Sequence, residues 1–244
     1  MSSSLLSSLV LLLSLGVAFP TSLQIQAEPP RVEGELSIPF FVNGTFYRTW
    51  VSQHVDPNPR ALSARPLVVL HGGPGLTHDY MLPLTDLAAS RPVIFYDQIG
   101  SGRSSHLGNN ATFTWGLDVF LDELDNVLRV LNVRDDFDLL GHSWGGVMAT
   151  EYAVRRKNKG LKRLVLSDSL PSNALWGQSE GELLSAFPEE VQRDVLVGFD
   201  DPARYRAGIG AFFAVHGCTV RPWPKPLNDS FDYLFSDPTP QIKM

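Results

Sequence analysis

The sequence has a single cysteine, more acidic than basic side chains and no long uninterrupted apolar run. One cysteine, Cys218, among 244 residues excludes an intrachain disulfide and therefore a small disulfide-stapled scaffold. Lys and Arg number 20 against 26 Asp and Glu, and this net charge of −6 argues against nucleic acid as the main partner, because phosphate binding needs a basic surface. The content of 43% hydrophobic and 19% charged residues is instead typical of a globular chain with one full core or two domains.

The N-terminus has the pattern of a leader. The first eighteen residues carry no charge, and the stretch from Leu5 to Phe19 is apolar apart from serines and one glycine. It is shorter than the run of about 20 residues that spans a bilayer. Small residues precede a possible cleavage after Ala18, with Ala27 as the alternative. The pattern predicts a signal peptide over residues 1–18 and a secreted protein, whereas an uncleaved leader would anchor the chain to a membrane of the secretory pathway.

Three Asn-x-Ser/Thr sequons fit a secreted protein. They begin at Asn43, Asn110 and Asn228. We expect these asparagines to be acceptors for N-glycosylation, which requires them to lie at the surface.

Strand and helix patterns alternate over the first two thirds of the chain. Two alternating apolar runs, Val32–Val42 and Thr45–Gln53, meet at Asn43-Gly44, which is a strong hairpin signal. Short apolar runs and amphipathic segments then take turns, which predicts a mostly parallel sheet with helices on both faces, opened by the antiparallel hairpin. The further strands are expected at Pro66–Leu70, Pro92–Tyr96, Phe137–Leu140 and Leu161–Ser167, and the helices near Asp79–Ser90, from Thr114 to Leu131 and at Gly145–Arg156.

The strand pattern stops after Leu170, where short helical, proline-containing pieces with many aromatic residues follow. Such a segment after a sheet strand is typical of a cap. We therefore expect an α/β core over residues 31–169, a helical cap over 170–235 and an irregular tail over 236–244.

The segment Gly141-His142-Ser143-Trp144-Gly145 matches the pattern G-x-S-x-G. An apolar strand leads into it and a helix of small residues leads out, which is the setting of a nucleophile elbow. Glycines permit a turn too tight for Cβ atoms, and such a turn raises the serine hydroxyl above the sheet. The pattern predicts Ser143 as a nucleophile rather than as a helix cap.

A second glycine-rich turn, His71-Gly72-Gly73-Pro74-Gly75, follows the strand that ends at Leu70. Backbone N–H groups in such a turn can be directed at a developing oxyanion. A phosphate-binding loop is excluded because no Gly-Lys-Ser/Thr follows and Pro74 lacks a donor. Residues 100–105 lack the third glycine of a dinucleotide fingerprint, so no cofactor is expected.

Three ordered motifs, His71–Gly75, Asp97–Ser104 and Gly141–Gly146, resemble the signatures of the prolyl aminopeptidase (proline iminopeptidase) family of α/β-hydrolases. The resemblance extends from about Val32 to Phe235 and includes the cap motifs around Cys218 and Trp223.

The resemblance implies that Ser143 is the nucleophile and that the N–H groups of Gly73 and Trp144 form the oxyanion hole. The activity it implies is release of an N-terminal residue, usually proline, from peptides or amides, without a metal or an organic cofactor. It leaves the oligomeric state open. The motif residues that shape the elbow and the loop are Gly141, Gly145, His71, Gly72 and Gly75.

The triad partners of the serine are harder to find. In this family the acid and then the histidine follow on later strands, but only 101 residues follow Ser143 and the cap takes most of them. His216 lies in the cap motif, and His142 is expected to point into the fold. Asp168 ends the last strand and is either a turn residue or an acid in a variant arrangement. We therefore expect a chain truncated at its C-terminus, with triad acid and base unassigned.

Two alternatives stay open at this stage. The same elbow serves esterases and lactonases that act on small-molecule acyl groups, and a chain without its triad partners can be a catalytically impaired homologue. Cap carboxylates are candidates for binding a substrate ammonium, although a solvated helix face explains them equally well. These are Glu180, Glu182, Glu189 and Glu190.

Overall fold

The computed structural model describes residues 32–108 and 113–244. The predicted signal peptide and the sequon at Asn110 lie outside these residues. Asn43 is exposed in the hairpin turn, whereas Asn228 is half-buried and its amide donates to the Trp223 carbonyl at 3.1 Å. No helix in the described ranges is long and apolar enough to cross a membrane.

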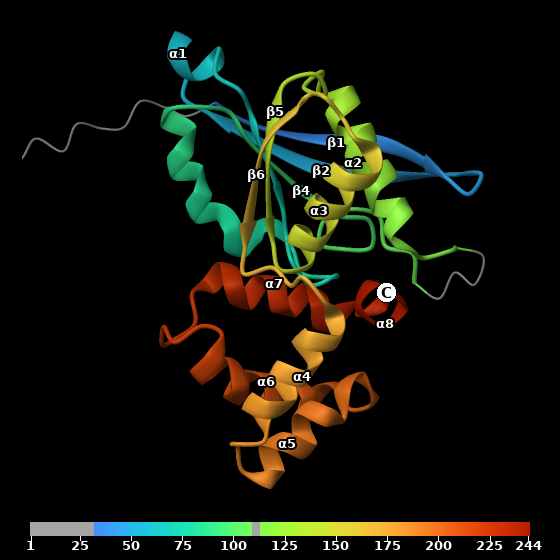
Figure 1. The fold of residues 1–244 in the computed structure, drawn as a ribbon, viewed down its shortest axis with the longest axis vertical. Coiled ribbons are helices and arrows are strands. Elements are labelled where there is room, and N and C mark those ends of the chain that lie inside the picture. The colour runs from blue at the N-terminus through green and yellow to red at the C-terminus, as the bar shows by residue number, and fades with distance from the viewer. Residues whose placement is uncertain (1–31, 109–112) are drawn as a thin grey trace, which may run out of the picture.

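A six-stranded mixed sheet forms the centre of the molecule (Figure 1), in the order β1-β2-β4-β3-β5-β6. β2 pairs antiparallel with β1 and β4, whereas β3 pairs parallel with β4 and β5, and β5 with β6. The predicted sheet with its opening hairpin is thereby confirmed. The strands are β1 (Val32–Val42), β2 (Thr45–Val55), β3 (Leu67–Leu70), β4 (Val93–Asp97), β5 (Phe137–His142) and β6 (Leu161–Ser167).

The hairpin between β1 and β2 has the turn geometry that its sequence predicts. Asn43 and Gly44 both have positive φ, 51° and 77°, as a two-residue hairpin with the right twist requires.

At the other side of the sheet, β6 is an edge strand, and Leu164, Val165 and Leu166 are 36%, 44% and 50% exposed. No strand follows β6 within the described residues.

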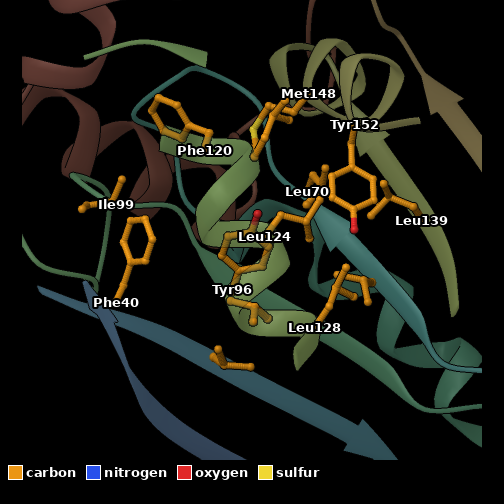
Figure 2. Close-up of a cluster of buried hydrophobic side chains, with 14 of the residues drawn as sticks. Phe40, Leu70, Tyr96, Ile99, Phe120, Leu124, Leu128, Leu139, Met148 and Tyr152 are labelled. Carbon is orange, nitrogen blue, oxygen red and sulfur yellow. The ribbon is translucent and has the colours of Figure 1, made fainter. Parts of the chain in front are cut away.

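Side-chain alternation along the central strands separates two apolar cores. In β3, Val68 and Leu70 face the larger core beneath α2 (Leu117–Val130) and α3 (Trp144–Arg156). Figure 2 shows Leu124 and Leu128 of α2 in this core. The intervening residues face the smaller core, where the 3-10 segment η1 (His78–Ala89) contributes Met81 and Ala88. Helical segments thus cover both faces, as the alternating pattern predicts.

One carboxyl group lies inside the larger core. Glu123 on α2 has no exposed surface, and its oxygens accept hydrogen bonds from the Thr49 hydroxyl at 2.5 Å and the Ile99 N–H at 2.9 Å. The side chain therefore ties α2 to strand β2 and to the loop that follows β4.

Helix boundaries depart from the sequence pattern at two places. The second helix begins at Leu117 rather than Thr114, because Gly116 is still extended with φ 169°. The predicted helix near Asp79–Ser90 is a 3-10 segment with Pro83 inside it. These differences leave the order of elements unchanged.

Residues after β6 form a helical layer at one end of the sheet (Figure 1). It contacts the loops that follow the parallel strands: a Cβ at Gly75 would meet Leu234, and one at Gly100 would meet Pro240. The Ser230 hydroxyl also accepts a hydrogen bond from the Thr77 N–H at 2.8 Å. Its elements are α4 (Asn173–Leu184), α5 (Glu189–Leu196), η2 (Gly198–Asp200), α6 (Pro202–His216), α7 (Lys225–Ser236) and α8 (Thr239–Lys243).

The prediction of an irregular tail over 236–244 is wrong. Thr239–Lys243 forms the short helix α8, with Pro240 in its first turn. Proline does not interrupt the helix at this position, because a first-turn N–H has no intrahelical partner to lose.

Candidate active site

Ser143 occupies a strained turn between β5 and α3. Its φ of 53° and ψ of −121° lie in a region that residues with a Cβ rarely adopt, and the strain costs about 1 to 3 kcal/mol. β5 ends at His142 and α3 begins at Trp144, so the serine alone makes the turn. The predicted strand-turn-helix setting is confirmed, and it is the geometry that presents a serine hydroxyl for attack.

The glycines of this elbow are needed because backbones approach closely. A Cβ added at Gly141 would lie 2.2 Å from the Gly145 carbonyl oxygen. One added at Gly145 would lie 2.3 Å from the carbonyl oxygen of Leu70, the last residue of β3. The start of α3 therefore packs directly on the end of β3, which leaves no space for a side chain.

Substitution of Gly145 by alanine is expected to destabilise the fold by about 3 kcal/mol or more, because the new methyl group would overlap the backbone of β3. Urea unfolding measures the change. Gly181→Ala is the matched control, since an added Cβ there meets nothing within 4 Å and helix propensity should stabilise α4 by up to about 1 kcal/mol. A Gly145→Ala protein with wild-type stability would contradict the close packing.

The loop His71–Gly75 lies against the elbow. A Cβ at Gly72 would be 3.1 Å from Ser143 Cβ, so the loop packs closely against the serine side chain. Gly73 and Gly75 have φ of 118° and 99°, which glycine adopts without steric cost. The structure thus brings together the two motifs that the sequence placed at the ends of different strands.

Hydrogen bonds hold this loop in place. His71 is fully buried; its Nδ1–H donates to the Gly72 carbonyl at 2.9 Å and its Nε2 accepts from the Gln98 N–H at 3.0 Å. Burial lowers the pKa of His71 to about 4, so the ring is neutral at neutral pH. The Gly72 N–H donates to the Tyr80 hydroxyl at 2.7 Å. Both nitrogens of His71 are therefore used to hold the loop.

Two backbone donors beside Ser143 are free. Within the described ranges, neither the Gly73 N–H nor the Trp144 N–H donates a hydrogen bond. The Gly73 N–H belongs to the loop His71–Gly75 and the Trp144 N–H to the first turn of α3. These two segments meet at Ser143. Such donors can stabilise negative charge on a substrate oxygen.

The His142 side chain, which is predicted to point into the fold, lies only partly inside it. Its ring is partly exposed, with Nδ1 2.8 Å from the Tyr80 hydroxyl and Nε2 3.9 Å from an Asp168 carboxylate oxygen. Strand alternation places His142 on the same face as Leu140, beyond the end of the apolar core. Burial lowers the pKa of His142, and the Asp168 charge opposes the shift. The residue links the elbow to η1 and to the end of β6.

The acid and base of a triad are not assigned among the described residues, where Ser143 Oγ has no hydrogen-bond partner. His216 packs in the cap between Phe187 and Phe212, with ring centroids 5.7 and 5.1 Å away. Asp168 has a positive φ of 46° and its side chain is 84% exposed.

The predicted cap carboxylates are largely exposed and lie on two helices, α4 and α5. Glu182 accepts from Gln178 at 2.9 Å, and Glu189 pairs with Arg193 at 3.4 Å. Partial burial raises the pKa of Glu180.

A polar cavity of about 520 Å³ lies between η1 and α7, but Ser143 does not line it, so the cavity does not define the site. No group of three or more metal-ligating side chains occurs in the described ranges.

Two site residues, Gln98 and Tyr80, were not singled out from the sequence. The Gln98 side chain connects the loop to α3: Nε2 donates to the His71 carbonyl at 2.9 Å and Oε1 accepts from the Trp144 indole at 3.0 Å. Its place in the motif Asp97–Ser104, directly after a buried strand, was the available signal.

Comparison with known proteins places this geometry in a family. The family model described as the alpha/beta hydrolase fold matches residues 65–204. A proline iminopeptidase of Lactobacillus delbrueckii subsp. lactis is 37% identical over 175 residues, covering 68% of this chain and 59% of that protein. The chain thus spans about three fifths of that relative's length.

Solved structures support the same family. VinJ superimposes with a TM-score of 0.74 at 36% identity, and the proline iminopeptidase of Mycobacterium smegmatis with 0.69 at 32%. In both comparisons 85% of this chain and 69% of the other chain are covered. The chain therefore belongs to the α/β-hydrolase family, and within it to the group of the proline iminopeptidases.

Proposed function

We propose that this chain is a serine hydrolase that releases an N-terminal proline, or another small residue, from peptides and amides. The observation that carries the proposal is Ser143, held at a strained elbow beside two free backbone donors. The names of its relatives support the choice of substrate.

In the proposed reaction, Ser143 Oγ attacks the carbonyl carbon of the N-terminal residue. The oxyanion that forms accepts hydrogen bonds from the N–H groups of Gly73 and Trp144, each worth about 3 kcal/mol of transition-state stabilisation. The C–N bond breaks, the amine leaves with the proton that Ser143 gives up, and water hydrolyses the acyl-enzyme. Within the described residues, no side chain is assigned to take the Ser143 proton.

A substrate pair tests the proposal on the 244-residue chain. We expect release of 4-nitroaniline from prolyl 4-nitroanilide, and faster release of 4-nitrophenol from the corresponding prolyl ester, whose leaving group needs no protonation. The Ser143→Ala protein gives the background rate, which is subtracted from both measurements.

Two results would overturn the proposal. Cleavage of a 4-nitrophenyl butyrate without action on either prolyl substrate would indicate an esterase. Equal rates for the wild-type and Ser143→Ala proteins on every substrate would indicate a catalytically impaired homologue.

A further inference from the structure

Gln98 lies at the junction of the two segments that carry the free backbone donors. It directly follows β4 and has no exposed surface. Its side chain donates to the His71 carbonyl at 2.9 Å and accepts from the Trp144 indole Nε1–H at 3.0 Å. Both ends of one amide are therefore used, one on each segment.

We propose that Gln98 is a positioning residue that sets the spacing between the Gly73 and Trp144 N–H groups. This inference rests on the proposed function, because it assigns those groups to the oxyanion hole. The His71 carbonyl precedes the glycines of the loop, and the Trp144 indole belongs to the residue whose backbone supplies the second donor. Because the amide is rigid and is bonded to both segments, a shift of one segment should move the other.

The chemistry of the contact is specific for glutamine. A carboxylate at this position would place an oxygen against the His71 carbonyl oxygen, where two acceptors repel each other. A methionine would leave both the carbonyl and the indole N–H without this partner in a buried place. The side-chain amide alone has a donor at one end and an acceptor at the other.

A backbone contact holds residue 98 in place independently of its side chain. The Gln98 N–H donates to His71 Nε2 at 3.0 Å, and this bond does not depend on the side chain. His71 is neutral and its other nitrogen is bonded to the Gly72 carbonyl. Substitution of the Gln98 side chain should therefore loosen the donor spacing without releasing the loop from the core.

The experiment compares Gln98→Met and Gln98→Glu with the wild type on the prolyl ester. We expect kcat to fall about 30- to 100-fold with KM unchanged within about twofold, since a displaced oxyanion hole loses interactions made only in the transition state. Asn126→Leu and Asn126→Asp are the matched controls. Asn126 is also bonded at both ends, to the Pro39 carbonyl at 2.9 Å and to Arg129 at 2.6 Å, but at a half-buried position between α2 and β1.

A second readout does not need activity. The ¹H–¹⁵N resonances of the Gly73 and Trp144 backbone amides and of the Trp144 indole should shift in Gln98→Met. The backbone amides of Met81 and Ala88 in the smaller core should keep their resonances. If the wild type shows no Ser143-dependent turnover, the proposed function fails, and these resonances still decide the positioning role.

Two outcomes would overturn the inference. One is a Gln98→Met protein with wild-type kcat and unshifted Gly73 and Trp144 amides. The other is a loss of rate that arises from KM alone, or shifts spread evenly over the chain, because both would indicate a general structural role.

Discussion

Replacement of Ser143 by alanine is expected to remove essentially all turnover of prolyl substrates and leave the rate measured without protein, because the attacking oxygen is removed while the fold is kept. Initial rates at saturating substrate measure the loss. Circular dichroism and urea unfolding check that the variant is folded.

Replacement by glycine separates catalysis from strain at the same position. Ser143→Gly should lose the same activity but gain about 1 kcal/mol of unfolding free energy over Ser143→Ala, because glycine adopts a φ of 53° without steric cost. Ser185 is the matched control, since its φ of −60° is helical and Ser185→Gly should be destabilising by about 0.5 kcal/mol. A Ser143→Gly protein less stable than Ser143→Ala would contradict the strain at the elbow.

Stability is expected to fall between about pH 4.5 and pH 8 because of Glu123. Burial raises the pKa of Glu123 from 4.5 to about 8, although hydrogen bonds from Thr49 and Ile99 oppose the shift. In this window the folded state binds the proton more tightly than the unfolded state, so raising the pH favours unfolding. The contribution is fully present below pH 4.5 and is lost through pH 8, a change on the order of 5 kcal/mol.

Glu123→Gln tests this contribution. The amide oxygen can accept from Ile99 and the amide nitrogen can donate to the Thr49 hydroxyl, so both contacts survive without a titrating group. Urea midpoints at pH 5, 6, 7 and 8 should therefore fall for the wild type and change less for the variant. Glu151→Gln, at a partly exposed site on α3, is the control and should follow the wild type. Parallel profiles for the wild type and Glu123→Gln would contradict the assignment.

The sequence was sufficient for those features that follow from local periodicity and turn chemistry. Apolar runs placed the strands, Asn43-Gly44 placed the hairpin, and glycines with a flanking strand and helix placed Ser143. Each of these signals lies within a few neighbouring residues. The short helix α8 was not predicted, because a segment of five residues is too short to display a helical repeat of apolar side chains.

Long-range contacts explain what the sequence could not reveal. Gln98 acquires its role from His71 and Trp144, which lie 27 and 46 residues away along the chain. The direction of His142 depends on Tyr80, 62 residues distant. Local sequence patterns do not reveal such pairs. The predicted site therefore lacked the side-chain hydrogen bonds that connect the ends of different strands.

The order of the strands has a consequence for where chemistry can occur. From β3 the chain moves to its neighbour β4 through η1, whereas from β5 it moves the opposite way to β6 through α3. The loops leaving β3 and β5 therefore diverge to opposite faces of the sheet, and the ends of two such adjacent strands are where open α/β sheets bind their ligands. Ser143 and the glycines at 72 and 73 lie at this topological switch point. The location of the site is thus a property of the chain's path, while its residues determine only which reaction it can support.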